Sequence, residues 1–138
     1  MKKFEVLDIS GDAGLKAYGK SLEEAFINTS LGMYSLITNL DLIEEKKSID
    51  VSVESNSLDG LLVSWLNELI FHFDAYGFIG KRVEIEHLSD NKIASTVTGE
   101  EFEPGRHEGK LLIKAATYHR LKIEQRGDIW ETSVIFDI

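Results

Sequence analysis

Alternating hydrophobic and polar residues mark the segments that we expect to form half-buried β-strands. The clearest is residues 49–54, in which Ile49, Val51 and Val53 alternate with polar neighbours. The segments predicted as strands are residues 3–8, 15–19, 49–54, 83–87, 92–102, 116–124 and 129–136. Turn-forming composition at residues 10–14, 89–91 and 126–128 separates neighbouring strands, and such short connections favour antiparallel pairing.

Two longer segments carry hydrophobic residues at helical spacing, and each begins with an N-cap signal. The first follows Ser21, which forms a capping box with Glu24 and predicts a helix that ends near Asn39. The second follows the N-cap Ser57 and ends at Gly77, a residue type that commonly terminates helices in the left-handed conformation.

These elements predict the α+β class, in which an antiparallel or mixed sheet carries two main helices packed on one face. The chain has 138 residues, 43% hydrophobic and 28% charged, and Pro104 is its one proline. No Pro-rich linker or other boundary divides the sequence. We therefore expect a single domain over residues 1–138.

The composition excludes several kinds of chemistry and favours a cytoplasmic location. The chain has no cysteine, so disulfides, zinc–thiolate sites and thiol nucleophiles are ruled out. The N-terminal residues lack the apolar stretch of a signal peptide, and the most apolar segment, residues 58–73, is too polar for a membrane span. We therefore predict a cytoplasmic protein with no membrane partner.

The net charge of −9 makes direct, tight binding of nucleic acid an unfavoured function. The lysines and arginines are scattered, whereas nucleic-acid binding needs a concentrated basic surface. An acidic surface suits a metal cation or a basic protein partner, and it also simply promotes solubility.

Carboxylates near the two ends of the chain are the first candidates for a functional site. Asp12 lies between glycines in a predicted turn, Asp137 is the penultimate residue, and Ile138 supplies the terminal carboxylate. If the fold brings them together, their oxygens would suit Ca²⁺ or Mg²⁺. On the sequence alone, Asp12 can equally be a turn former and Asp137 a solvated end.

The histidines give a weaker signal, because none of them has the spacing of a known metal motif. His107 lies in a loop and His119 in a predicted strand, and both are candidate functional residues. The sequence also lacks a nucleophile elbow and a phosphate-binding loop. Trp65 and Trp130 fit the periodicity of core residues better than that of base-stacking residues.

Several motifs are more specific in combination than any one of them is alone. The segments are residues 10–19, 21–26, 61–69, 99–100 with His107, 113–119 and 134–138. Trp65-Leu66-Asn67-Glu68-Leu69, Lys114-Ala115-x-Thr117-Tyr118-His119 and the terminal Asp137-Ile138 are the most specific. Together they resemble the archease family over nearly the whole chain. One departure is Ile9-Ser10-Gly11-Asp12, where the family usually has His-Thr-Ala-Asp.

The resemblance implies an accessory protein and not an enzyme. Archeases promote tRNA splicing by stimulating the RtcB-type RNA ligase, which uses GTP and forms a guanylylated histidine. They support guanylylation and multiple turnover. The resemblance also implies that Asp12, Asp137 and the Ile138 carboxylate bind a divalent cation, usually Ca²⁺, with Mg²⁺ or Mn²⁺ as alternatives. It marks Lys114 as a further functional position.

Three other functions remain open at this stage. A general chaperone or protein-binding module would need an exposed apolar patch. A small metal-dependent hydrolase would combine Asp12 and Asp137 with His107 or His119. A purely structural cation site would raise stability without affecting any ligase.

Overall fold

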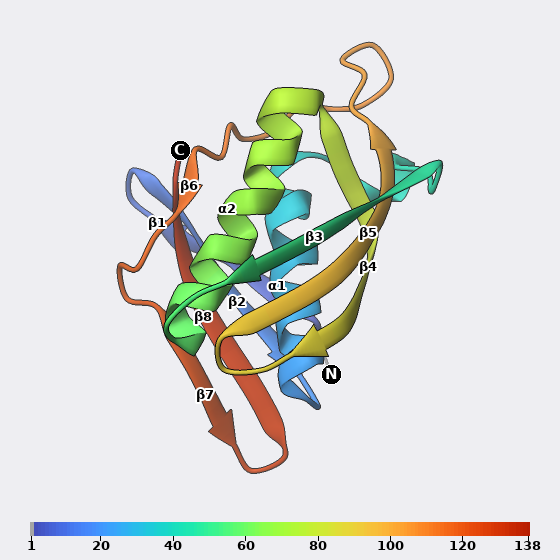
Figure 1. The fold of residues 1–138 in the computed structure, drawn as a ribbon. Helices are drawn as coiled ribbons and strands as arrows, with labels where there is room; N and C mark the ends of the chain where they lie inside the picture. The colour runs from blue at the N-terminus through green and yellow to red at the C-terminus, as the bar shows by residue number, and fades with distance from the viewer. Residues whose placement is uncertain (1) are drawn as a thin grey trace.

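The computed structural model describes residues 2–138, which form two antiparallel sheets with two helices between them (Figure 1). The strands are β1 (Phe4–Ile9), β2 (Asp12–Gly19), β3 (Lys47–Glu54), β4 (Phe78–Leu88), β5 (Lys92–Glu101), β6 (Ala115–Ala116), β7 (Lys122–Arg126) and β8 (Ile129–Asp137). The helices are α1 (Leu22–Ile37) and α2 (Leu58–Tyr76), with a short 3₁₀ helix, η1, at Leu40–Leu42. The predicted α+β class with two main helices is confirmed, and the strands divide between two sheets.

The five-stranded sheet joins the two ends of the chain. Its order is β1-β2-β8, and β6 and β7 both pair with β8. Helix α1 covers the inner face of this sheet and also contacts β4 of the second sheet, whose order is β3-β5-β4. Within residues 2–138, no helix packs against the outer face of the five-stranded sheet, which is the usual arrangement of an antiparallel sheet with one solvated face.

The first helix begins where the sequence predicts, but its capping differs in detail. The Ser21 hydroxyl accepts the Glu24 N–H at 3.1 Å. The Glu24 carboxylate accepts the N–H of Lys20 at 3.3 Å, and not that of Ser21 as a regular capping box requires. The helix ends at Ile37, slightly before the predicted end at Asn39, because the Asn39 side chain instead caps η1.

The second helix has the predicted start and stop. The Ser57 hydroxyl accepts the Gly60 N–H at 3.0 Å, and Gly77 ends the helix with φ +70°. Its buried Trp65 stacks on Phe26 of α1 and donates its ring N–H to the Ser95 hydroxyl at 3.0 Å. Trp65 is therefore a core residue, as its periodicity indicates.

Two predicted elements are wrong in their extent. Residues 116–124 do not form one strand, because the chain leaves β8 after Ala116 and returns only at Lys122. His119 therefore lies in an exposed turn and not in a strand. The predicted turn at residues 10–14 is also shorter than expected, since Gly11 with φ +80° completes a tight hairpin and Asp12 already pairs with Ile9.

Within residues 2–138, neither helix is both long enough and apolar enough to cross a lipid bilayer.

Candidate functional site

The register of the five-stranded sheet brings Asp12 and Asp137 together. Strands β2 and β8 pair antiparallel, with Ala13 opposite Phe136. One step further along the same register, Asp12 at the start of β2 faces Asp137 at the end of β8. Directly opposed residues in such a pair have Cα atoms about 4.5–5.5 Å apart. Ala13 and Phe136 point into the core, so the two aspartates lie on the outer face.

The strands on either side complete this end of the sheet. Ile9 of β1 is paired with Asp12, and Ala115 of β6 is paired with Asp137. The Lys114 N–H donates to the carbonyl of Asp137 at 2.8 Å. Lys114 and Asp137 are exposed, and Asp12 is half-buried. The sequence-predicted residues Asp12, Asp137 and Lys114 therefore lie at one end of the sheet, next to the chain terminus.

Asn67 on α2 fixes the position of β6. Its side-chain oxygen accepts the Ala116 N–H at 2.7 Å, and its side-chain nitrogen donates to the Ala116 carbonyl at 3.3 Å. On the other side of β6, Thr117 donates its N–H and its hydroxyl to the carbonyl of Ile135. Two of the specific sequence motifs thus meet here and hold β6 against the end of β8.

Sequence reasoning did not single out Asn67 as a positioning residue. The available signal was a polar residue among the hydrophobic positions 61–70 of a predicted helix, where an amide must find hydrogen-bond partners. Which partner it finds depends on the tertiary fold, because Ala116 is distant in the sequence.

The donors at this end of the sheet suit a hard divalent cation. Like charges repel, so a bound cation would relieve any repulsion between the two carboxylates. The part of the chain that the structure describes contains no group of three His, Cys, Asp or Glu side chains arranged for a metal ion. A site here would therefore use Asp12, Asp137 and the terminal carboxylate of Ile138, with water or a partner completing the coordination.

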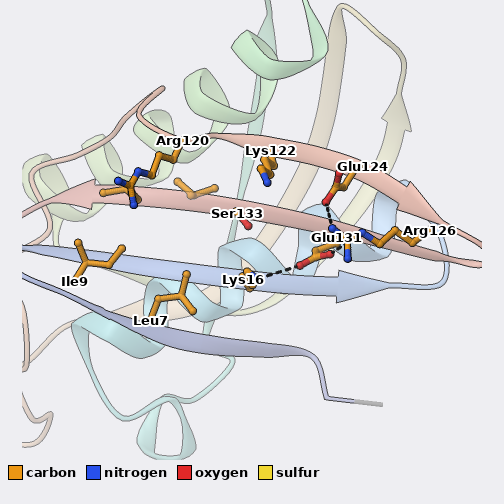
Figure 2. Close-up of a pocket in the computed structure, with 11 residues that line it drawn as sticks. Leu7, Ile9, Lys16, Arg120, Lys122, Glu124, Arg126, Glu131 and Ser133 are labelled. Atoms are coloured by element: carbon orange, nitrogen blue, oxygen red, sulfur yellow. Dashed lines mark hydrogen bonds and ion pairs between the residues drawn. The ribbon is translucent and has the colours of Figure 1, made fainter.

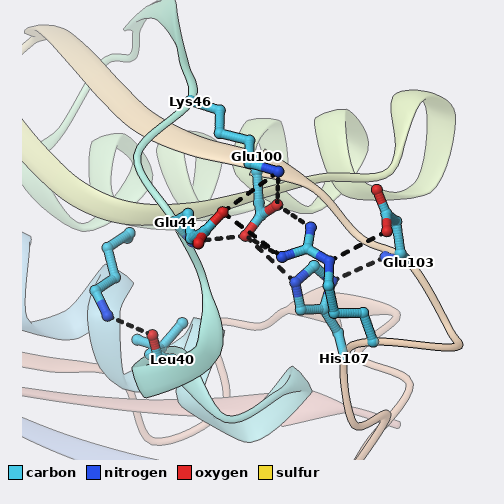
Figure 3. Close-up of polar contacts among 8 residues, drawn as sticks. Leu40, Glu44, Lys46, Glu100, Glu103 and His107 are labelled. Carbon is cyan, nitrogen blue, oxygen red and sulfur yellow. Dashed lines mark hydrogen bonds and ion pairs between the residues drawn. The ribbon is translucent and has the colours of Figure 1, made fainter.

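The candidate histidines are not part of this site. His107 is buried, and its Nδ1 accepts the Glu103 N–H at 2.9 Å (Figure 3). Its Nε2 lies 3.3 Å from a carboxylate oxygen of Glu100, outside hydrogen-bond alignment. His119 is in the exposed turn. Residues 2–138 include no group of three metal-binding side chains in which either histidine joins Asp12 and Asp137.

Glu100 at the end of β5 is the centre of the polar cluster around His107. Its buried carboxylate is bound by the Arg106 guanidinium, accepts the Glu44 N–H at 2.6 Å, and lies 3.5 Å from the Lys46 ammonium (Figure 3). The hydrogen bond from Arg106, opposed by burial, lowers the pKa of Glu100 from 4.5 to about 2.

This polar cluster has a structural role that reaches the candidate site. It fixes residues 100–107, after which Lys110 and Leu111 donate their N–H groups to the carbonyls of Ile37 and Leu36 at the end of α1. The chain then continues directly to Lys114 and β6. The cluster therefore holds the beginning of the segment that leads from residue 107 to Lys114 at the end of the sheet.

The fold places the chain in a defined class of small two-sheet α+β proteins. Its structure is similar to the solution structure of protein 1598 of Methanobacterium thermoautotrophicum, with a TM-score of 0.84, 35% identity and full coverage of both chains. It also shares its fold with a Thermotoga maritima protein described as an archease and possible chaperone, with a TM-score of 0.65 and 22% identity over 96% of this chain and 94% of that one.

The sequence comparisons identify the family within this class. Residues 4–138 match the model of the Archease protein family (MTH1598/TM1083). The archease of Pyrococcus furiosus is 38% identical over the full length of both chains. That of Thermococcus kodakarensis is 37% identical over 93% of this chain and 92% of its own. The chain belongs to the archease family.

Proposed function

We propose that this archease is an accessory protein that activates an RtcB-type tRNA-splicing RNA ligase by promoting its guanylylation and turnover. The observation that carries the proposal is the pairing of β2 with β8, whose register continues to Asp12 and Asp137, in a member of this family. In this proposal the joining of RNA ends belongs to the ligase, and the archease contributes no catalytic residue of its own.

The shape of the site supports a role in contact with a partner. Asp137 and Ile138 are exposed at the end of a strand, so they can reach into a cavity of another protein. Asp12, Asp137 and the terminal carboxylate would hold the cation, probed first with Ca²⁺. When bound, that cation would supply a positive charge at the end of the sheet. Lys114, hydrogen-bonded to Asp137 through the backbone, would contribute a second positive charge beside it.

The test of this function is a ligation assay with more RNA than ligase. The substrates carry a 3′-phosphate or 2′,3′-cyclic phosphate on one end and a 5′-hydroxyl on the other. We expect product to stop near one equivalent per ligase without the archease and to continue for several turnovers with it. Equal turnover with and without the archease would exclude the proposed function.

The cation site predicts that calcium stabilises the isolated protein. A ligand present at 100 times its dissociation constant stabilises the folded state by about 2.7 kcal/mol. We therefore expect saturating Ca²⁺ to raise the melting temperature by several degrees, measured by calorimetry, and EDTA to reverse the increase. Asp12→Asn and Asp137→Asn should abolish the effect, and the exposed Asp90→Asn should retain it. An unchanged calcium effect in both site variants would place the cation elsewhere.

A chaperone function is a second candidate, because several large apolar side chains are exposed. Leu112 is 72% exposed, Tyr76 61% and Phe71 51%. This function predicts that the protein suppresses light scattering by unrelated proteins as they unfold on heating, and that Asp12→Ala leaves the suppression unchanged. The ligase function predicts no suppression in the same experiment.

A further inference from the structure

The outer face of the five-stranded sheet contains a groove that begins beside the candidate cation site. It has a volume of about 200 Å³ and is formed by β1, β2, β7 and β8 (Figure 2). Its apolar residues are Leu7, Ile9, Val134 and Ile135. Gly14 lies between the strands that carry them, and a Cβ at this position would come within 2.5 Å of the Ile9 side chain. A glycine here therefore leaves room for the Ile9 side chain to lie over β2.

The basic residues of the groove outnumber its acidic ones, although the chain as a whole has a net charge of −9. Lys16 is paired with Glu131 at 3.6 Å, and Arg126 with Glu124 at 2.8 Å. Arg120 and Lys122 also line the groove, but the ion pairs found in residues 2–138 include neither of them. Two positive charges are thus left without a carboxylate partner in the described chain.

The backbone at Arg120 adopts an unusual conformation that brings this side chain to the groove. Its φ of +54° is in the left-handed region, which residues other than glycine, asparagine and aspartate seldom adopt. Figure 2 shows the Arg120 side chain at the end of the groove near Ile9, with Lys122 beside Ser133. Such conformations persist where the surrounding structure holds them, and they are concentrated at ligand sites.

We propose that this groove binds an organic phosphate, with the phosphoryl group on Arg120 and Lys122 and an apolar ring on Leu7, Ile9 and Ile135. A phosphate monoester carries a charge of about −1.5 to −2 at pH 7, which matches the two unpaired cations better than a single carboxylate does. Arginine binds phosphate oxygens through two parallel hydrogen bonds, and the Ser133 hydroxyl can add a further donor.

The small size of the groove favours a ligand with one phosphate and one ring system. Its volume is below the range of roughly 300–1,000 Å³ that is typical of drug-sized ligand pockets. A free mononucleotide and the terminal nucleotide of an RNA strand both present this chemistry. The sequence has no glycine-rich phosphate loop from which this site could be predicted. Four strands form the site from residues that are distant along the chain.

The groove lies on the same face as the two aspartates. Gly14 is two residues from Asp12 on β2, and Ile135 is two residues from Asp137 on β8, so the side chains of each pair point the same way. A ligand in the groove would therefore have its apolar ring, on Ile9 and Ile135, nearer to a cation held by the aspartates than its phosphate, because Lys122 is paired with Ser133, further along β8. The binding itself does not rest on the proposed ligase function, since it can be measured on the archease alone.

The test is a titration of the ¹⁵N-labelled protein followed by NMR at low ionic strength. The probes are adenosine 5′-monophosphate, adenosine and inorganic phosphate, together with a short single-stranded RNA that ends in a 3′-phosphate. We expect the monophosphate to bind more tightly than adenosine and to shift the amides of Gly14, Lys122 and Ile135. The double variant Arg120→Asn with Lys122→Gln should weaken its binding by about tenfold or more. Asparagine is chosen because it tolerates the left-handed conformation.

The matched control for the double variant is a substitution at a lysine outside the groove. Lys92→Gln removes one exposed positive charge from the other sheet and should leave the affinity unchanged. Tighter binding of the RNA than of the monophosphate would assign the groove to a strand end, and the reverse would assign it to a free nucleotide. No saturable binding at millimolar monophosphate, equal binding of adenosine, or an unchanged affinity in the double variant would overturn the proposal.

Discussion

Replacing Asp12 or Asp137 by alanine is expected to abolish the stimulation of the ligase without unfolding the archease. Neither side chain is part of the buried core, since Asp12 is half-buried and Asp137 is exposed. Surface substitutions of this kind usually change stability by no more than about 0.5 kcal/mol. We expect each variant to reduce multiple-turnover ligation to the level of the ligase alone, because removal of one carboxylate leaves too few donors to hold the cation.

The matched control for these variants is Asp90→Ala, which removes an exposed carboxylate from a turn of the second sheet. It should stimulate as the unmodified protein does. Circular dichroism should be the same for all of these proteins, and the variants should melt in EDTA at a temperature no lower than that of the unmodified protein. Full stimulation by both site variants would show that the paired carboxylates are not the functional group of this archease.

The second large effect is a loss of folding stability, expected when Glu100 is replaced by alanine. Removal of one partner from a buried ion pair typically costs about 3–5 kcal/mol, because the other charge loses its compensation. Arg106 is 37% exposed and can turn toward water, so we expect Glu100→Ala to destabilise by about 3 kcal/mol. Urea unfolding measures this directly. Glu101→Ala, at the exposed neighbouring position, should change the unfolding free energy by less than about 0.5 kcal/mol.

The lowered pKa of Glu100 predicts how the folding stability depends on pH. The pKa of Glu100 is lowered from 4.5 to about 2 in the folded protein, so the unfolded chain takes up its proton first as the pH falls. The contribution of Glu100 is therefore fully present above pH 4.5 and is lost progressively between pH 4.5 and about 2. Glu100→Gln should lack this component of acid destabilisation. A constant difference in unfolding free energy between the two proteins from pH 6 to pH 2.5 would contradict this account.

The local signals in the sequence were sufficient for the helices and most of the strands. Ser21, Ser57 and Gly77 act within one turn of their own positions, and their roles in the sequence and in the structure agree. The strand predicted at residues 116–124 was wrong in its extent, because it depends on contacts with a distant segment and not on local signals. Whether those residues remain in the sheet depends on their pairing with β8, and only Ala115 and Ala116 stay paired before the turn at Arg120.

The candidate site was predictable in its residues but not in its geometry. Asp12 and Asp137 were identified from sequence motifs, whereas their alignment follows from the pairing of β2 with β8, which are at opposite ends of the chain. The surroundings of His107 could not be predicted from the sequence, because they are built by tertiary contacts. Burial beside Glu100 makes it part of a structural cluster, which its position in a predicted loop did not indicate.

The most direct test of the proposed function is single-turnover guanylylation of a cognate RtcB-type ligase, measured with GTP in the presence and absence of the unmodified archease. The ligase function predicts a faster formation of the guanylylated ligase when the archease is added. It also predicts that the increase requires the divalent cation. An unchanged rate at saturating archease and cation would contradict the central claim and would favour the chaperone function instead.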